Sequence, residues 1–366
     1  MADLTSGLLP GMTVAVTGAS GNVGTALLRR LADAGVTEVR GLSRRRPPET
    51  EPYAGVRWFD ADLSRPSSEP VLAEFLAGAD AVVHLAWALL PDREPDVLHA
   101  VNIEGTRRVL AAAGAAGVAH VVHMSSIGTY AAGPQTHPVG EDWPNTGIPS
   151  STYSRQKAEC ERIVAEFAEA HPDTTVSVTR PTLVLQPDAA SEIGRYFLGP
   201  YLFPVARALP GAVAKLPLPM TLPVPAPIPS SLHLAFIHSD DVGDAIARIL
   251  DRRAPGPFNL AAPPDFDADG LARALGVRRV PVPAAVLRAG MQAAFAAHVL
   301  QVEPGWLDMG LGVPPLDTRK ARTQLEWRAR HSGGDVLREF VAALTSGEGH
   351  TGPLLHPGTG PEHTPA

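Results

Sequence analysis

The 366-residue sequence predicts an α/β fold, namely a doubly wound parallel sheet of the Rossmann type followed by a smaller, mixed C-terminal region. Three observations support this. Short apolar runs alternate with amphipathic segments over the first half of the chain, a glycine-rich turn follows the first run, and the composition changes after about residue 185. Alternating strands and helices indicate right-handed βαβ units and a sheet covered on both faces.

The elements can be assigned in order along the chain. Residues 12–17 read as a buried strand, and a helix is expected from Asn22 to Ala34, ended by Gly35. Five further strands are expected at 39–43, 56–60, 81–86, 120–126 and 175–185, the last interrupted at Pro181. Helices are expected at about 96–113 and over the segment that begins near TYSRQKAEC and runs to about Ala170.

After residue 185 the pattern is less regular. Residues 215–231 carry proline at nearly every second position, which predicts an extended loop covering a pocket. A strand and a helix capped by Ser239 or Asp240 are expected within 234–250. The mostly apolar helix at 284–302 is expected to be buried against the small domain, with a pocket lid or a membrane-surface helix as alternatives.

These features predict three regions. Residues 1–185, with a return segment near 232–250, form mainly the nucleotide-binding domain. Residues 186–345 form mainly the substrate-binding region, and the Gly/Pro/His-rich residues 346–366 are expected to be a disordered tail.

The composition excludes several classes of protein. Hydrophobic residues make up 45% of the chain, the net charge is −7, and Arg44–Arg46 is the densest basic run, so no nucleic-acid partner is expected. The single cysteine, Cys160, excludes an internal disulfide framework and a cysteine-based metal site. The absence of a signal-peptide pattern and of a membrane-span pattern favours a cytoplasmic protein that acts on a small-molecule substrate. The sequence leaves a homodimer open.

The glycine-rich turn TGASGNVG indicates nucleotide binding. Gly18 permits a tight turn, Gly21 lets a phosphate approach the backbone, and Gly24 lets the helix pack on the sheet. The backbone N–H groups around Asn22 and Val23 then face the pyrophosphate at the positive end of the helix dipole.

The end of the second strand indicates which dinucleotide binds. An NAD site usually has an acidic residue about 20 positions after the turn, where it binds the ribose 2′-hydroxyl. Here the sequence reads GLSRRRP, so Ser43, Arg44 and Arg45 stand where a 2′-phosphate would lie. Guanidinium groups suit phosphate, and NADP is therefore favoured. An NAD site that manages without the acid, beside a solvated basic loop, is the alternative.

Tyr153 and Lys157 lie four residues apart, which places them one turn apart on one face of a helix. A lysine ammonium beside a phenol favours the phenolate and should lower the pKa of the tyrosine. The spacing alone is common, and two exposed helix residues would show it equally well.

Together these motifs resemble the extended short-chain dehydrogenase/reductase family, of the NAD-dependent epimerase/dehydratase type, over roughly residues 12–345. The resemblance rests on TGASGNVG, the DL of FDADL, HLA at 84–86, the asparagine of VNIEGT, HMSSIGTY, YSRQK and RPT at 180–182. IHSDDVGDAI and PFNLAAP look like the later motifs of the family. The order and spacing of these motifs favour the catalytic interpretation of Tyr153 and Lys157.

The resemblance implies a catalytic set of Ser126, Tyr153 and Lys157. Tyr153 would exchange a proton with the substrate oxygen. Lys157 would lower the pKa of Tyr153 and also hold the nicotinamide ribose. Ser126 would hydrogen-bond the carbonyl oxygen as charge develops on it. Ser125 is the alternative serine, and its simpler role is to close the strand end.

The resemblance also implies a cofactor groove. Asp62 would meet the adenine with Leu63 packed on it, whereas Asn102 is expected to hold the central helix rather than react. Pro181 and Thr182 would border the nicotinamide. The expected cofactor-binding residues are Gly18, Gly21, Asn22, Val23, Gly24, Ser43, Arg44, Arg45, Asp62, Leu63, Leu85, Ala86, Trp87, Asn102, Tyr153, Lys157, Pro181 and Thr182. No metal ligand is expected.

The sequence departs from the sugar-nucleotide members of the family. Many of them carry an asparagine and a Y-G-P shortly after the Arg-Pro, whereas this chain reads RPTLVLQPDA. Residues 196–236 are mostly apolar, with Arg207 and Lys215 as their few cations, which suits a diphosphate poorly. We therefore expect an oxidoreductase acting on a weakly charged carbonyl or secondary alcohol. A nucleotide-sugar epimerase or dehydratase is the alternative. A non-enzymatic NADP-sensing protein is a third interpretation, which the Tyr/Lys pair disfavours.

Overall fold

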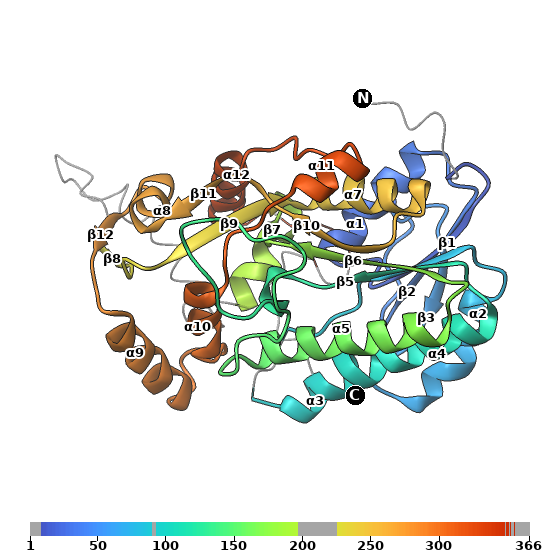
Figure 1. Cartoon of the computed structure of the whole chain (residues 1–366), viewed down its shortest axis with the longest axis horizontal. Helices are drawn as coiled ribbons and strands as arrows, with labels where there is room; N and C mark the ends of the chain where they lie inside the picture. Colours follow the sequence, from blue (N-terminus) through green and yellow to red (C-terminus); the bar gives the residue numbers. More distant parts are fainter. Residues whose placement is uncertain are drawn as a thin grey trace.

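A computed structural model of the chain describes residues 9–89, 93–196, 225–347, 349–350, 352 and 355. Its largest sheet has seven strands in the order β10-β6-β5-β4-β1-β2-β3, and every neighbouring pair is parallel (Figure 1). The strands are β1 (Thr13–Thr17), β2 (Glu38–Ser43), β3 (Arg57–Asp60), β4 (Ala81–His84), β5 (His120–Met124), β6 (Thr175–Pro181) and β10 (Gly256–Leu260). The predicted Rossmann-type sheet is confirmed, with the strand order reversing between β1 and β4, where such sheets bind ligands.

Helices cover both faces of this sheet. Helices α1 (Asn22–Asp33) and α7 (Ser239–Arg252) pack on one face, and α2 (Glu69–Leu76), α4 (Gly105–Ala116) and α5 (Thr152–Ala170) pack on the other. Val14 and Val16 of β1 belong to the first core and Ala15 to the second, as the alternation of a strand requires. The continuous apolar runs in the sequence therefore reflect burial on two sides.

The smaller region is mixed. Strands β7 (Leu183–Leu185) and β9 (His233–His238) are parallel, and β11 (Ala262–Asp267) joins β9 antiparallel. A second small sheet pairs β8 (Pro225–Pro227) with β12 (Arg278–Val280). The other helices among the described residues of this region are α8 (Ala268–Ala274), α9 (Ala284–Ala296), α10 (Gly305–Gly312), α11 (Arg319–Gln324) and α12 (Gly333–Ser346). Between β9 and β11 the chain returns to the large sheet through α7 and β10 (Figure 1).

The helix expected at 96–113 is interrupted. The structure has α3 (Pro95–His99), a π-helical segment (Ala100–Glu104) and then α4. The carbonyl oxygen of Asn102 lies in this wider turn, where it accepts hydrogen bonds from Thr106 Oγ1 at 2.5 Å and Cys160 Sγ at 3.3 Å. These side chains satisfy the Asn102 carbonyl in the interrupted segment, and π-helical turns of this kind are frequent at functional sites.

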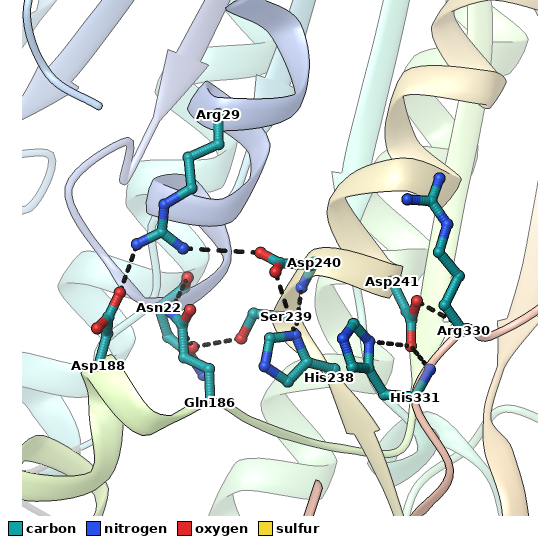
Figure 2. Close-up of polar contacts among 10 residues, drawn as sticks. All are labelled: Asn22, Arg29, Gln186, Asp188, His238, Ser239, Asp240, Asp241, Arg330 and His331. Atoms are coloured by element: carbon teal, nitrogen blue, oxygen red, sulfur yellow. Dashed lines mark hydrogen bonds and ion pairs between the residues drawn. The ribbon is translucent and has the colours of Figure 1, made fainter. Parts of the chain in front are cut away.

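Two further expectations are wrong. Helix α7 is capped by His238, not by Ser239 or Asp240, because His238 Nδ1 accepts a hydrogen bond from the Asp240 N–H at 3.1 Å (Figure 2). None of the residues of α9 is buried, and Val286 is 62% exposed. The apolar side chains of α9 instead line a shallow cavity shared with Pro227, Val282 and Leu300.

Some of the expectations from the sequence concern segments that the structure describes only in part. Most of the proline-rich segment 215–231 and of the tail 346–366 lies outside the described residues. Within the tail, His350 packs edge-on against Tyr53 and Leu355 is fully buried. No helix in the described ranges is long and apolar enough to cross a membrane. The described residues also contain no group of three His, Cys, Asp or Glu side chains placed to hold a metal ion.

Candidate active site

The loop after β1 forms a cradle for an anion. Gly18 has a φ of +68°, and a Cβ atom there would lie 2.8 Å from the Ala86 nitrogen after β4. A Cβ on Gly24 would overlap the Gly18 carbonyl oxygen, so both positions require glycine. Helix α1 begins after Gly21 with no side-chain cap and no acidic residue in its first turn. Its N–H groups and the positive end of its dipole therefore suit the pyrophosphate of a dinucleotide.

The Asn22 side chain holds the start of α1 in place. Its Nδ2 donates to the Val184 carbonyl at 3.0 Å, and its Oδ1 accepts from Gln186 Nε2 at 2.9 Å and from Ser239 Oγ at 2.5 Å (Figure 2). Arg29, further along α1, forms ion pairs with Asp188 and Asp240. Asn22 therefore ties the start of α1 to β7 and α7, and only its backbone remains for a phosphate.

The end of β2 presents two arginines to solvent. Ser43 is buried and its hydroxyl donates to the Arg45 carbonyl at 2.8 Å, so it shapes the loop. Arg44 and Arg45 are exposed. Arg46, the third of the run, donates to the Trp58 carbonyl at 3.1 Å. The two arginines expected to bind a 2′-phosphate are thus accessible.

Asp62 and Leu63 lie in the loop after β3. Asp62 Oδ1 accepts hydrogen bonds from the Ser64 N–H at 3.0 Å and the Ser64 hydroxyl at 2.7 Å. Leu63 is 4% exposed and packs against Gly105 at the start of α4, where a Cβ atom would lie 3.1 Å from the Leu63 Cβ. Leu63 is thus buried beneath the loop, and contact of Asp62 with an adenine stays a prediction.

The loop after β4 is held in place by Asn102. Its Oδ1 accepts from the Ala88 N–H at 2.8 Å, and its Nδ2 donates to the Ala88 carbonyl at 2.9 Å and to Gln156 Oε1 at 2.8 Å. The Ala86 N–H donates to Thr17 Oγ1 at 3.3 Å. Asn102 therefore fixes the segment that carries Leu85, Ala86 and Trp87 and links it to α5, rather than holding only the central helix.

The three expected catalytic residues meet at the carboxyl end of β5. Ser126 follows this strand and its Oγ accepts from the Gly128 N–H at 3.1 Å. Tyr153 and Lys157 lie one turn apart on α5, which Ser151 caps by accepting from the Ser154 N–H at 3.3 Å. A side-chain hydrogen bond joins Ser126 to Tyr153.

Lys157 is buried between backbone and aromatic groups. Its Nζ donates to the Met124 carbonyl at 3.0 Å and lies 3.5 Å from the centroid of the Trp87 ring. Burial lowers the pKa of Lys157 to about 7, against the opposing effects of Cys160 and Glu161. Its charge is therefore retained below neutral pH and lost above it.

The lowered pKa expected for Tyr153 is not found in this structure. Burial raises the pKa of Tyr153 to about 12, and the hydrogen bond with Ser126 opposes this rise. The Lys157 Nζ lies 5.9 Å from the centroid of the Tyr153 ring, and loss of its own solvation weakens its charge near pH 7. Tyr153 is consequently a protonated phenol at neutral pH, suited to donate a proton.

Nine buried side-chain polar atoms have no hydrogen-bond partner within the described part of the chain, and three of them follow strands at this edge of the sheet. These three are Ser125 Oγ after β5, Thr182 Oγ1 after β6 and Trp87 Nε1 after β4. Pro181 is the last residue of β6, is buried, and directly precedes Thr182. Because buried polar groups are normally paired, these atoms indicate that this edge accommodates a polar ligand. Together with the glycine cradle, they fit a nicotinamide dinucleotide.

A buried ion pair between Arg180 and Glu161, which no sequence motif indicates, lies beneath the site. Arg180, just before Pro181, binds both carboxylate oxygens of Glu161 on α5, with Nε and Nη2 at 2.9 and 2.5 Å. Arg180 Nη1 also donates to the Tyr130 hydroxyl at 2.9 Å and to the Glu141 carbonyl at 2.8 Å. The network joins the end of β6 to the helix that carries Tyr153. Arg180 belongs to the RPT motif noted in the sequence, but no pattern of neighbouring residues predicts its ion pair with Glu161.

Helix α10 also contributes to the site, and no sequence pattern predicts that it packs against Tyr153. Trp306 packs on the Tyr153 ring with centroids 4.7 Å apart, and Met309 belongs to the same apolar cluster. The Trp87 ring meets Tyr153 edge-on at 5.7 Å. These contacts bury the phenol, which explains its raised pKa.

Comparison with known proteins places this geometry in a family. The model of the NAD dependent epimerase/dehydratase family matches residues 14–261. The UDP-glucose 4-epimerase of Thermus thermophilus, solved in complex with NAD, shares the fold with a TM-score of 0.66 at 20% identity, over 91% of this chain and 99% of that one.

Two curated relatives match about half of the chain. The N-acetyl-α-D-glucosaminyl-diphospho-ditrans,octacis-undecaprenol 4-epimerase of Escherichia coli O157:H7 is 32% identical over 47% of this chain and 48% of its own length. The decarboxylating sterol-4-α-carboxylate 3-dehydrogenase of Saccharomyces cerevisiae is 27% identical over 48% of this chain and 52% of its own length. The chain thus spans about half the length of the curated relatives it matches. Since the family model covers most of the residues from β1 to β10, the chain belongs to the NAD dependent epimerase/dehydratase family.

Proposed function

We propose that the protein is an NAD(P)-dependent oxidoreductase that transfers hydride between NADP(H) and a weakly charged carbonyl or secondary alcohol. The observation that carries this proposal is the meeting of Ser126, Tyr153 and Lys157 beside the glycine cradle, in apolar surroundings. A bound nicotinamide would supply or accept the hydride at this edge of the sheet.

In this proposal the side chains of the chain handle the proton. The Ser126 hydroxyl donates a hydrogen bond to the carbonyl oxygen, which gains negative charge as the carbon is reduced. Tyr153, whose pKa of about 12 keeps it protonated at neutral pH, gives its proton to that oxygen and yields the alcohol. Once the alcohol has left, the Ser126 hydroxyl can donate its single hydrogen to the phenolate, and the Lys157 ammonium stabilises the phenolate when Lys157 is charged. Alcohol oxidation reverses these proton transfers.

The surroundings of Tyr153 support an apolar substrate. Its cluster consists of Ile127, Ile148, Tyr153, Trp306, Met309 and Val313. Such a wall excludes water and strengthens hydrogen bonds to the reacting oxygen, but it leaves a buried diphosphate without compensation. Leu222 and Val224, expected in the pocket wall, lie outside the described residues.

The similarity to a sterol dehydrogenase also supports this class of substrate. Similarity to the undecaprenol-linked 4-epimerase favours the alternative, epimerisation of a nucleotide or lipid-linked sugar. A direct assay separates the two proposals. NADPH oxidation should be followed with aromatic, alicyclic and steroid-like ketones, and epimerisation with UDP- and dTDP-sugars. We expect turnover of the ketones, and turnover confined to the sugars would establish the alternative.

The preference for NADP rests on Arg44 and Arg45. Replacing both by alanine should weaken NADPH binding by at least roughly tenfold, because each charge-assisted hydrogen bond contributes about 1.5–3 kcal/mol. NADH binding should barely change. Fluorescence titration of both cofactors measures this. Arg46→Ala is the matched control, since its guanidinium binds the Trp58 carbonyl. Equal losses for both cofactors, or tighter NADH binding by the parent protein, would contradict the assignment.

A further inference from the structure

Tyr153 contacts one indole from each half of the molecule. Trp87, after β4, meets the phenol ring edge-on, with the ring planes at 77°. Trp306, on α10 of the C-terminal region, lies closer and more nearly parallel, with centroids 4.7 Å apart and planes inclined by 34°. Trp87 is one of the expected cofactor-binding residues, whereas Trp306 is not among them.

Hydrogen bonds join Glu303, just before α10, to Thr152 at the start of α5, one residue before Tyr153. Glu303 Oε1 accepts a hydrogen bond from the Thr152 N–H at 2.6 Å, and Glu303 Oε2 accepts from the Thr152 hydroxyl at 3.2 Å. A carboxylate is favourable at a helix N-terminus. The backbone of Gly305 approaches α5 so closely that a Cβ atom would lie 2.7 Å from the Ser151 Cα. Two contacts with residues adjoining Tyr153 therefore fix the position of Trp306.

The next turn of α10 continues this surface. Met309 lies against the loop that follows Ser126, where its Sδ would be 2.8 Å from a Cβ atom on Gly128. The same hypothetical atom would lie 2.9 Å from Cε1 of Tyr153. The indole of Trp306 thus adjoins the Tyr153 ring, and the thioether of Met309 adjoins the loop that follows Ser126.

We propose that Trp306 determines substrate specificity by stacking on a flat, apolar ring system fused to the reacting ketone or alcohol. This inference rests on the proposed function and narrows its substrate class. An indole face gains stacking and burial from a planar ring but little from a short aliphatic group. A hydrated diphosphate placed against it would lose solvation without receiving hydrogen bonds.

Two ketones that differ by one fused ring test this. Trp306→Ala should lower kcat/KM for 2-tetralone by roughly tenfold, mainly through KM, as expected from losing about 1.4 kcal/mol of stacking. The value for cyclohexanone should fall by a smaller factor, because loss of the indole alters the surroundings of Tyr153 for both ketones but removes stacking only for 2-tetralone. Trp306→Phe keeps an aromatic face and should retain most of the selectivity. Equal losses on both ketones would show a purely structural role for Trp306 and overturn the inference.

A binding measurement on a variant that cannot turn over substrate tests this inference independently of the proposed function. The Kd of 2-tetralone should be measured with NADPH-bound Tyr153→Phe protein, with and without Trp306→Ala. Weaker binding in the double variant supports the role of Trp306, even if the parent protein reduces no ketone and the proposed function fails. Turnover of 2-tetralone with binding insensitive to Trp306 overturns the inference alone. No binding of 2-tetralone to either protein overturns the inference as well.

Discussion

Tyr153→Phe is expected to abolish ketone reduction while leaving NADPH affinity nearly unchanged. The substitution keeps the ring between Trp87 and Trp306 but removes the proton that the carbonyl oxygen must receive. Loss of a general acid typically costs about 10²–10⁴-fold in rate. Steady-state kinetics and fluorescence titration of NADPH measure the two effects.

Lys157 provides the companion test. Lys157→Ala should reduce both turnover and NADPH affinity, because the ammonium is expected to stabilise the phenolate and to bind the nicotinamide ribose. Lys320→Ala is the matched control, since Lys320 also donates to a backbone carbonyl, that of Pro257, and lies 4.4 Å from the centroid of an aromatic ring, that of Phe258. Substantial turnover by the Tyr153→Phe protein would rule out the proposed mechanism.

Glu161→Gln is expected to lower the free energy of unfolding by about 3–5 kcal/mol, because it leaves the Arg180 guanidinium buried without its counter-ion. Both side chains are about 5% exposed, Arg180 at 5% and Glu161 at 4%. Urea denaturation followed by circular dichroism measures the loss. The same change should lower turnover, because Arg180 directly precedes Pro181 and Thr182, which are expected to border the nicotinamide.

An exposed pair on the same helix supplies the control. Arg162 and Glu166 lie one turn apart on α5 with side chains more than half exposed. Glu166→Gln should therefore change the stability by about 0.5 kcal/mol or less. Pairing Glu161→Gln with Arg180→Met removes the stranded charge and should recover part of the stability. A loss below about 1 kcal/mol for Glu161→Gln would contradict the importance of this buried pair.

Local patterns in the sequence predicted the parts of the fold that depend on neighbouring residues. The apolar runs of β1, β4 and β5 and the glycines after β1 gave the sheet and the cradle, because strand burial and turn geometry are set within a few residues. The four-residue spacing of Tyr153 and Lys157 likewise gave their shared helix face.

Features that depend on distant segments could not be predicted in this way. Thr152 and Glu303 are 151 positions apart, so nothing near Tyr153 indicates that α10 covers it. The spacing of Tyr153 and Lys157 suggested a lowered tyrosine pKa, but burial beneath Trp306 raises it. The partners of the Asn22 side chain on β7 and α7 lie more than 160 positions away, so no local pattern could predict this link.

The central claim is that hydride passes between NADPH and a ketone at Tyr153. The most direct measurement supplies NADPH carrying two deuterium atoms at C4 of the nicotinamide, with 2-tetralone as substrate, and analyses the alcohol by mass spectrometry. We predict deuterium at the carbinol carbon with the parent protein, and no labelled alcohol with Tyr153→Phe. The proposed function would be contradicted if 2-tetralone were recovered unreduced with no net oxidation of NADPH while a UDP-sugar was epimerised.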